Sequence, residues 1–282
     1  MFGTRVLNQV ELYGSRSRKV KLSSGLELEV NDLSELSNSG EIDLFIPLAF
    51  GTQDKLNEYG FEKYLDLNNR LIKFHEDIIL GSEISRTITV SSGIVKFNQS
   101  ELDRPDSFWI YRDLKKLEED VLSEALSKKN VTHVACRLFS ITGSEMIDPL
   151  KYAIGNMILQ AHEKKSISIQ APNPVFRKYV DAESLCKLLV LLSEGGQNRR
   201  FDSTGTLIEI SDLATAIAKT LNLVSENVIR PQNVASISDL YYSTDDSMEN
   251  FFLDYKIETS SIKNQILNTY RGLIESGYVR QR

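Results

Sequence analysis

The chain has 282 residues, of which 41% are hydrophobic and 26% are charged, and its formal net charge at pH 7 is -6. This composition is typical of a globular protein that buries a core in one large domain or two unequal ones, and it excludes disorder throughout the chain. The 33 basic residues form no long block. Nucleic-acid binding needs clustered Lys and Arg, so we expect no nucleic-acid partner.

Sequence features of export and of membrane insertion are also missing. The first residues, MFGTRVLNQV, are not the uninterrupted apolar stretch of a signal peptide. No later run approaches the roughly 20 apolar residues of a membrane span. Cys136 and Cys186 both lie in apolar runs, where buried and reduced thiols are expected. We therefore expect a cytoplasmic protein without membrane association.

The first half of the chain alternates between strand-like and helix-like segments. Residues 41–50 and 86–92 are apolar runs of strand length, and residues 64–80 between them carry apolar side chains at helical spacing. A helix over 109–128 and a strand over 131–139 repeat the pattern. Buried strands that alternate with helices favour a parallel sheet covered on both faces. The predicted fold class is therefore α/β, with a doubly wound parallel sheet.

The alternation stops after Gly143. Helices are predicted over residues 149–164, 183–194 and 210–221, with an extended segment over 167–172. These elements favour a smaller, partly helical lobe. We expect the doubly wound domain over residues 1–145 and mainly the lobe over 146–282, with some elements that return to the sheet.

One pair of side chains has the composition of a proton-transfer site. Tyr111 and Lys115 stand four residues apart on a predicted helix, so both lie on one face. A phenol has an ordinary pKa of about 10, and a neighbouring ammonium favours the phenolate. Tyr59 and Lys63 have the same spacing, but only Tyr111 follows an apolar strand that ends near Ser92, and ligands bind at this edge of doubly wound sheets. Taken alone, the Tyr111 and Lys115 pair also fits a solvated helix surface.

Several segments resemble, in order, the extended short-chain dehydrogenase/reductase family, which contains NAD(P)-dependent nucleotide-sugar epimerases and dehydratases. The similar segments are IDLFIPLAF (42–50), LNN (67–69), TVSSG (89–93), YRDLK (111–115), RLFSITG (137–143), RKYVDAESL (177–185), FDSTG (201–205) and EISDLATAIA (209–218). Their order makes the resemblance more specific than any one motif. It implies a Rossmann-like domain for residues 1–145 and a substrate-binding lobe for residues 146–282.

The resemblance also implies roles for individual residues. Tyr111 would exchange a proton with a substrate oxygen, Lys115 would hold the nicotinamide ribose and lower the pKa of Tyr111, and Ser92 would hydrogen-bond the reacting oxygen. The implied cofactor-binding residues are Gly3, Arg16, Arg18, Leu48, Ala49, Phe50, Asn68 and Lys115, and the implied substrate-binding residues are Ser92, Ser140 and Arg177. Arg177 would clamp a substrate phosphate. A strand-end cap for Ser92 and a surface ion pair for Arg177 are the alternatives.

The dinucleotide-binding pattern is incomplete at its beginning. The segment FGTRVL (2–7) is similar to the end of the glycine-rich turn, with Gly3 as its third glycine, and the first two glycines and their strand are missing. If VELYG (10–14) is the second strand, Arg16 and Arg18 lie at its end, where the family places Arg for NADP. A solvated basic turn fits these arginines equally well. NADP is slightly favoured over NAD.

The resemblance restricts the reaction as well. Gly93 and Ile94 stand where dehydratases of the family carry an acid and a base, so epimerisation or carbonyl reduction is favoured over dehydration. It implies a nucleotide-sugar substrate and a homodimer. The three histidines are scattered without metal-ligand spacing, so no metal is expected.

Two further hypotheses stay open. The chain could be a catalytically impaired relative that acts as a binding or scaffold subunit. It could also be a different α/β enzyme, such as a glycosyltransferase.

Overall fold

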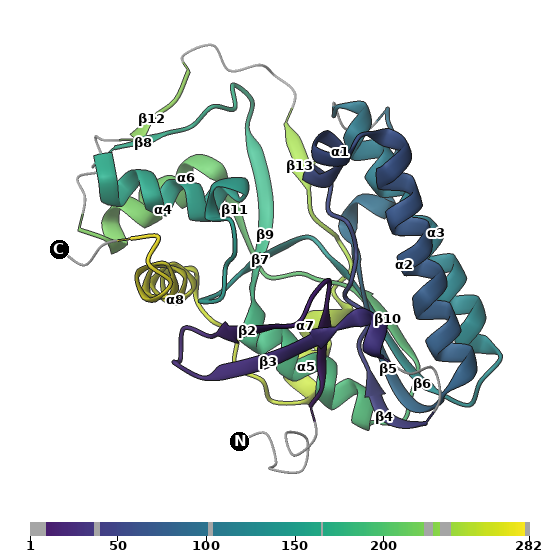
Figure 1. The fold of residues 1–282 in the computed structure, drawn as a ribbon. Coiled ribbons are helices and arrows are strands. Elements are labelled where there is room, and N and C mark those ends of the chain that lie inside the picture. Colours follow the sequence, from purple (N-terminus) through teal and green to yellow (C-terminus); the bar gives the residue numbers. More distant parts are fainter. Residues whose placement is uncertain are drawn as a thin grey trace.

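A four-stranded parallel sheet forms the centre of the molecule (Figure 1). The computed structural model describes residues 10–36, 40–100, 104–164, 166–222, 228–231 and 238–279. The strands are β4 (Glu41–Phe45), β5 (Glu83–Ser92), β6 (Thr132–Leu138) and β10 (Arg199–Asp202), in the spatial order β10-β6-β5-β4. All three pairings are parallel, so the carboxyl ends of the strands meet at one edge.

Helices cover both faces of this sheet (Figure 1). The helices α2 (Phe61–Gly81) and α3 (Asp106–Ser127) connect β4 to β5 and β5 to β6, and their apolar sides pack on one face around Ile78, Ile79 and Leu122. The helices α5 (Ala182–Glu194) and α7 (Ser247–Asp254) cover the other face, where Leu188 and Phe252 are buried. The predicted doubly wound α/β fold is confirmed.

A second lobe begins where β6 ends. Phe139 separates β6 from β7 (Ser140–Thr142), which leaves the central sheet and pairs with β9 (Val175–Asp181). The strand β9 also pairs with β11 (Thr206–Glu209) and β13 (Asp239–Tyr241). The helices of this lobe are α4 (Ala153–Lys164), α6 (Ile210–Thr220) and α8 (Ile262–Glu275), and a two-stranded sheet joins β8 (Ile167–Ser168) to β12 (Val228–Ile229).

The core of the lobe is separate from that of the central sheet. Ile158, Leu213, Ile217 and Ile266 are fully buried where α4, α6 and α8 meet. The chain does not stay in this lobe, because α5, β10 and α7 lie against the central sheet. Residues from the second half of the chain therefore build parts of both regions.

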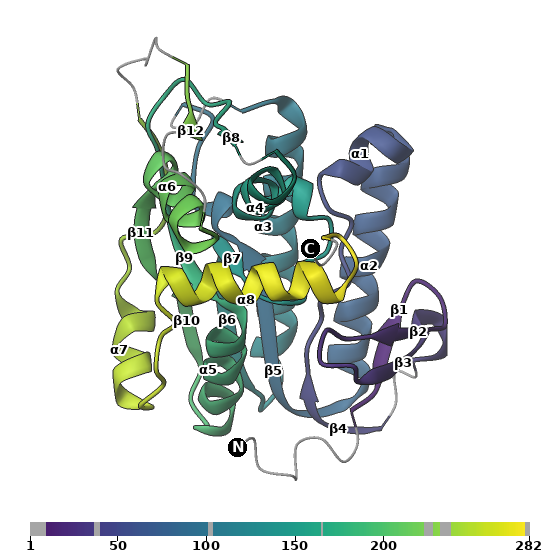
Figure 2. The same ribbon diagram turned by 90° about the vertical axis from the view of Figure 1, so that its left-hand side faces the viewer.

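A small mixed sheet at the beginning of the chain lies beside β4 (Figure 2). Its strands are β1 (Leu12–Gly14), β2 (Arg18–Lys21) and β3 (Glu27–Asp32), and β3 pairs parallel with β1 and antiparallel with β2. The interpretation of residues 10–14 as a strand of the central sheet is therefore wrong. The backbone groups of β1 are hydrogen-bonded to β3, and β4 is an edge strand paired with β5 in the described part of the chain.

The remaining short elements connect these layers. They are α1 (Asp54–Tyr59) and the 3-10 helices η1 (Leu33–Glu35), η2 (Gly93–Lys96) and η3 (Pro149–Lys151). Cys136 is buried as predicted, but Cys186 is exposed, because Leu185 and Leu188 are the α5 side chains that face the sheet. Among the helices of the described ranges, none is both long and apolar enough to cross a bilayer.

Candidate active site

The candidate site lies at the carboxyl edge of β4 and β5. The segment that follows β4, residues 46–53, carries Leu48, Ala49 and Phe50, and β5 ends at Ser92. The first turns of α3 pack beside the end of β5 and bring Tyr111 to the same edge. This is where doubly wound sheets bind ligands, because the connecting segments open outward there.

Tyr111 is surrounded by aromatic side chains. Its ring meets the ring of Phe50 edge-on, with 5.9 Å between the ring centroids, and packs against the cluster of Ile94 and Trp109. By contrast, Tyr59 of the second Tyr-x-x-x-Lys pair is 40% exposed and lies under the ammonium of Lys55. Burial at the sheet edge therefore distinguishes Tyr111 from Tyr59, as the position of the motif in the sequence indicates.

Ser92 connects Tyr111 to a residue that the sequence analysis missed. The Ser92 hydroxyl lies 3.5 Å from the hydroxyl of Tyr241, and it lowers the pKa of the nearby Tyr111 phenol. Ser92 is also the N-cap of η2, so the alternative that Ser92 is a cap is true and is compatible with its place in the candidate site. Tyr241 lies on β13, 149 residues further along the chain, so no local sequence signal could link it to Ser92.

The Lys115 ammonium contacts Glu118 and Phe50. It lies 2.7 Å from Oε2 of Glu118, one turn further along α3, and 3.7 Å from the ring centroid of Phe50. Both charged side chains are buried, at 10% exposure for Lys115 and 7% for Glu118. The ring of Phe50 therefore contacts both members of the Tyr111 and Lys115 pair.

Several groups act on the pKa of Tyr111. Burial raises the pKa of the Tyr111 phenol, and Tyr241, Tyr64 and Glu118 raise it further, against a lowering hydrogen bond from Ser92. The lowering of this pKa by Lys115 stays a prediction, and the Lys115 ammonium forms an ion pair with Glu118.

Asn68 fixes the segment after β4 rather than facing an open site. Its side chain is fully buried, its Oδ1 accepts a hydrogen bond from the Gly51 amide at 2.8 Å, and its amide donates to the Tyr64 carbonyl at 3.1 Å. The Tyr64 hydroxyl donates in turn to the Gly51 carbonyl at 3.0 Å. Asn68 therefore anchors the end of the 46–53 segment, while Leu48 near its middle is 66% exposed.

We expect Asn68→Ala to lower the free energy of unfolding by about 1–3 kcal/mol, because it leaves the Gly51 amide without its buried acceptor. Urea unfolding measures the change. Asn69→Ala, at an exposed position on the same helix, is the matched control and should stay within about 0.5 kcal/mol of the parent protein. Equal effects of the two substitutions would contradict the anchoring role.

Arg177 meets a carboxylate of its own chain. On β9, its Nη2 lies 3.0 Å from Oδ2 of Asp239 on β13, and its Nη1 donates to Oδ1 of Asp239 at 3.3 Å. Arg104 donates to the same Oδ2 at 2.5 Å. Burial alone would raise the pKa of Asp239, but the two arginines outweigh it and hold this pKa below its ordinary value. Arg177 thus forms an ion pair, as its alternative interpretation predicts, but the pair is mostly buried and does not lie at the surface.

The strand β13 brings both Asp239 and Tyr241 over the site (Figure 1). Tyr241 stacks on Phe97 at 5.5 Å between ring centroids and packs at a tilt on Phe139 at 5.1 Å. The guanidinium of Arg177 lies 5.4 Å from the ring centroid of Tyr241. Ser140, another predicted substrate-binding residue, lies on β7 opposite Tyr179 of β9 and is half-buried.

The residues in the dehydratase acid and base positions are packed. A Cβ atom built on Gly93 would lie 2.5 Å from the ring of Phe139, so no side chain fits there. Ile94 is fully buried beside Trp109. Neither residue can transfer a proton, and the prediction against dehydration stays a prediction.

Of the predicted cofactor-binding residues at the beginning of the chain, Gly3 lies outside the described residues. Arg16 and Arg18 are exposed in the small sheet, in the turn after β1 and at the start of β2. Because β1 is not a strand of the central sheet, the structure does not bring these arginines to its edge.

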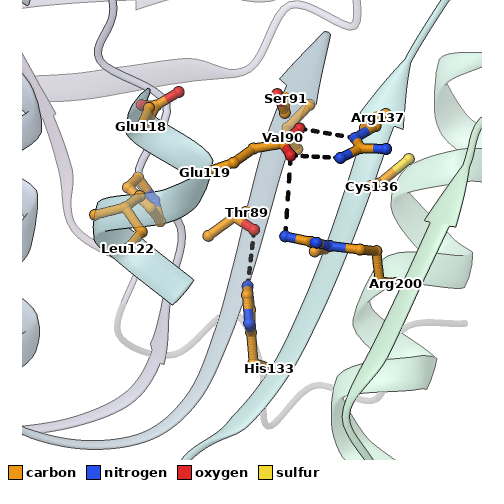
Figure 3. Close-up of a pocket in the computed structure, with 12 residues that line it drawn as sticks. Thr89, Val90, Ser91, Glu118, Glu119, Leu122, His133, Cys136, Arg137 and Arg200 are labelled. Carbon is orange, nitrogen blue, oxygen red and sulfur yellow. Dashed lines mark hydrogen bonds and ion pairs between the residues drawn. The ribbon is translucent and has the colours of Figure 1, made fainter. Parts of the chain in front are cut away.

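An ion-pair cluster lies on the α3 side of the sheet (Figure 3). Glu119 accepts two hydrogen bonds from Arg137 at 2.9 and 2.7 Å, and Arg200 approaches the same carboxylate to 3.9 Å. The hydroxyl of Thr89 is 2.8 Å from Nε2 of His133. These groups line a cavity of about 20 Å³, which suffices for about one water molecule.

His133 makes folding sensitive to acid. Burial, reinforced by Arg200, lowers the pKa of His133 from 6.5 to about 4. Between these pH values the unfolded chain binds a proton that the folded chain does not, so we expect stability to fall as the pH falls from 6.5 to about 4. His133→Gln should reduce the slope of the free energy of unfolding against pH by about 1.4 kcal/mol per pH unit, as measured by urea unfolding. An unchanged slope would contradict this assignment.

A wider pocket of about 760 Å³ lies away from Tyr111. It is lined by the segment after β7, the start of α5 and one side of α8, including Asp181, Cys186 and Arg271. Neither this pocket nor the cavity near Glu119 is lined by Tyr111. Among the described residues, no group of three or more His, Cys, Asp or Glu side chains could hold a metal ion.

No protein-family model and no curated protein match the sequence. Solved structures do match the fold. UDP-N-acetylglucosamine 4-epimerase from Methanobrevibacter ruminantium M1 has a TM-score of 0.65 at 18% identity, over 83% of this chain and 77% of that chain. The dTDP-glucose 4,6-dehydratase of Bacillus anthracis, in complex with NAD, has a TM-score of 0.61 at 11% identity, over 84% and 74%.

UDP-glucuronic acid 4-epimerase from Bacillus cereus, also in complex with NAD, has a TM-score of 0.58 at 14% identity, over 77% of this chain and 68% of that chain. At these identities the likeness concerns the fold, and it extends over both the central sheet and the second lobe. The resemblance stated from the sequence is thus confirmed at the level of fold. The chain shares the α/β fold of these nucleotide-sugar epimerases and of this dehydratase.

Proposed function

We propose that the protein is an NAD(P)-dependent epimerase or reductase that acts on a nucleotide-sugar-like substrate. The observation that carries the proposal is the position of Tyr111, whose partly buried phenol lies near Ser92 at the carboxyl edge of β5. The solved structures of the same fold are enzymes that act on UDP- and dTDP-sugars, and two of them are in complex with NAD. We propose that residues 146–282 mainly hold the substrate.

Tyr111 transfers the proton in this proposal. Its phenol donates a proton to a substrate carbonyl during reduction, or takes one from a hydroxyl during oxidation, and the Ser92 hydroxyl hydrogen-bonds the same oxygen. The cofactor, when bound, accepts or returns the hydride. Gly93 and Ile94 supply no acid or base for loss of water, so the chemistry stays at epimerisation or carbonyl reduction.

The residues around Lys115 fit a nicotinamide ribose under one condition. The ring of Phe50 covers the ammonium of Lys115 at 3.7 Å, and Glu118 is its ion-pair partner. A ribose hydroxyl reaches Lys115 once the half-buried Phe50 side chain turns away. Ala49 and the exposed Leu48 lie on the same segment and would border the cofactor.

Arg177 is proposed to hold an anionic group of the substrate. Its guanidinium already forms a two-point contact with Asp239, and a phosphate can replace that carboxylate with the same geometry. Ser140 on β7 is proposed to border the sugar. NADP and NAD are both kept as cofactors, because the arginines that favour NADP lie in the separate small sheet.

The test is a binding measurement with both cofactors. NADPH and NADH fluorescence is followed on addition of the protein, with and without UDP- and dTDP-sugars, and then turnover is assayed. Fluorescence enhancement together with turnover supports the proposal. No enhancement with either cofactor would overturn it.

The second candidate is a catalytically impaired relative that acts as a binding or scaffold subunit. Two observations favour it: the ring of Phe50 on Lys115 and the pairing of Lys115 with Glu118. This candidate predicts that a nucleotide sugar binds and that no turnover follows with either cofactor.

We also propose a homodimer through α2 and α3. Phe61 is 53% exposed and Leu117 is 43% exposed, so these two helices present apolar side chains outward. Light scattering during size-exclusion chromatography checks the oligomeric state. The cytoplasmic location expected from the sequence stays a prediction.

A further inference from the structure

Glu118 controls where the Lys115 ammonium lies. The two residues stand three positions apart on α3, and Nζ of Lys115 lies 2.7 Å from Oε2 of Glu118. Phe50 lies against the other side of the ammonium and against the ring of Tyr111. In the described part of the chain, Lys115 thus has a carboxylate and an aromatic face as its partners, and the Tyr111 hydroxyl is not one of them.

Burial raises the pKa of Glu118, and the nearby Lys115 opposes that rise. Both side chains are nearly excluded from water, and a buried charge needs its partner because its hydration is lost. The other carboxylate oxygen, Oε1, lies 3.8 Å from Nδ1 of His75 on α2, which is 3% exposed. Burial and the nearby Lys115 lower the pKa of His75 to about 4, so His75 is neutral near pH 7 and does not compete for the carboxylate.

Burial is the largest cause that opposes the phenolate of Tyr111, and three titratable groups add to it. They are Tyr241 on β13, Tyr64 on α2 and Glu118 on its own helix; the two tyrosines are neutral phenols near pH 7, and Glu118 carries a carboxyl group. The Ser92 hydroxyl, at the end of β5, is the group that favours the phenolate. Replacing Glu118 with a neutral residue would therefore remove a negative charge that opposes the phenolate of Tyr111. It would also free the Lys115 ammonium from its ion pair.

We propose that Glu118 is a positioning residue that draws the Lys115 ammonium into a buried ion pair and so keeps it from supporting the phenolate of Tyr111. The consequence for catalysis rests on the proposed function, in which Tyr111 transfers the proton. Because Glu118 is close to Lys115 and not to the reacting oxygen, it acts on Tyr111 through Lys115 and through its own charge.

The experiment follows the Tyr111 phenol itself and needs no turnover. A fluorinated tyrosine, whose phenol is more acidic than that of tyrosine, is placed at position 111, and its ionisation is followed by fluorine NMR from neutral to mildly alkaline pH. The variants are Glu118→Gln, Lys115→Met and their combination. Glu124→Gln is the matched control, since Glu124 pairs with Lys128 on the exposed side of the same helix.

Glu118→Gln should lower the midpoint of the phenol titration by about one pH unit, because an opposite charge within reach shifts a pKa by roughly 1–3 units. Adding Lys115→Met should reverse part of that shift. Lys115→Met in the parent background leaves the Glu118 carboxylate unpaired, so its effect is interpreted only together with Glu118→Gln, and Glu124→Gln should change nothing. If Glu118→Gln does not fold, Glu118→Met, an uncharged side chain of similar length, takes its place with the same expected shift.

An unchanged midpoint in Glu118→Gln would overturn the inference. Failure of this inference can be distinguished from failure of the proposed function. A shifted phenol without any NAD(P)H binding would contradict the proposed function alone, and NAD(P)H binding with an unshifted phenol would contradict this inference alone.

Discussion

Replacing Tyr111 with Phe should lower kcat by about 10²–10⁴-fold, the range that general acid or base catalysis contributes. Only the hydroxyl is lost, and the ring keeps its contacts with Phe50 and the cluster of Ile94 and Trp109. We therefore expect binding of NADPH and of the nucleotide sugar to stay close to that of the parent protein. Turnover assays and fluorescence titrations measure the two effects separately.

Tyr59→Phe is the matched control for this substitution. Tyr59 belongs to the second Tyr-x-x-x-Lys pair and is 40% exposed, so its hydroxyl has no place in the proposed chemistry. Its variant should keep full activity. A loss below about tenfold in Tyr111→Phe would contradict the role of Tyr111 in proton transfer.

Replacing Asp239 with Asn should tighten the binding of a nucleoside diphosphate sugar by about tenfold or more. The Asp239 carboxylate engages Arg177 and Arg104, and a substrate phosphate brought to the same arginines meets its negative charge. Like charges brought together without solvent oppose binding strongly, and about 1.4 kcal/mol corresponds to a factor of ten. Asparagine keeps the size of the side chain and removes the charge.

Isothermal titration with UDP-glucose measures this change at two salt concentrations. The gain should shrink at high salt, since screening weakens the repulsion that was removed. Asp66→Asn, which removes a carboxylate from an exposed pair with Arg70, should leave the affinity unchanged. Weaker binding in Asp239→Asn would mean that Asp239 helps to hold Arg177 ready for the substrate and does not exclude it.

The alternating part of the fold could be predicted because local patterns determine it. Apolar runs gave β4, β5 and β6, and helical spacing gave α2 and α3 between them. These elements lie in chain order in the sheet, so each one packs beside its sequence neighbour. The return of β10 to the edge beside β6 is different, because its partner is about 65 residues away and its short run RRFD carries little pattern.

The small sheet at the beginning of the chain could not be predicted from such patterns. Residues 10–14 look the same as a strand of a central sheet, and only the pairing of β1 with β3 decides where they lie. Pairing depends on contacts between distant residues, which periodicity does not contain. The assignment of Arg16 and Arg18 to a cofactor site depended on that strand, which lies in the small sheet, and it stays a prediction.

In the candidate site, positions could be predicted and partners could not. Tyr111 and Ser92 meet, as their places at the end of a strand and on the next helix indicate. The engagement of Lys115 by Glu118, the contact of Phe50 and the approach of Asp239 and Tyr241 are all matters of packing. Glu118 carried the best available signal, since a Glu three residues after a Lys on a helix is within reach of it.

The central claim is tested most directly by following deuterium from NADPH labelled at C4 of the nicotinamide into a UDP-4-keto sugar. Deuterium should appear at C4 of the sugar with the parent protein and with Tyr59→Phe, and its transfer should be slowed about 100-fold or more with Tyr111→Phe. Transfer at the same rate with Tyr111→Phe, or none with the parent protein, would contradict this claim.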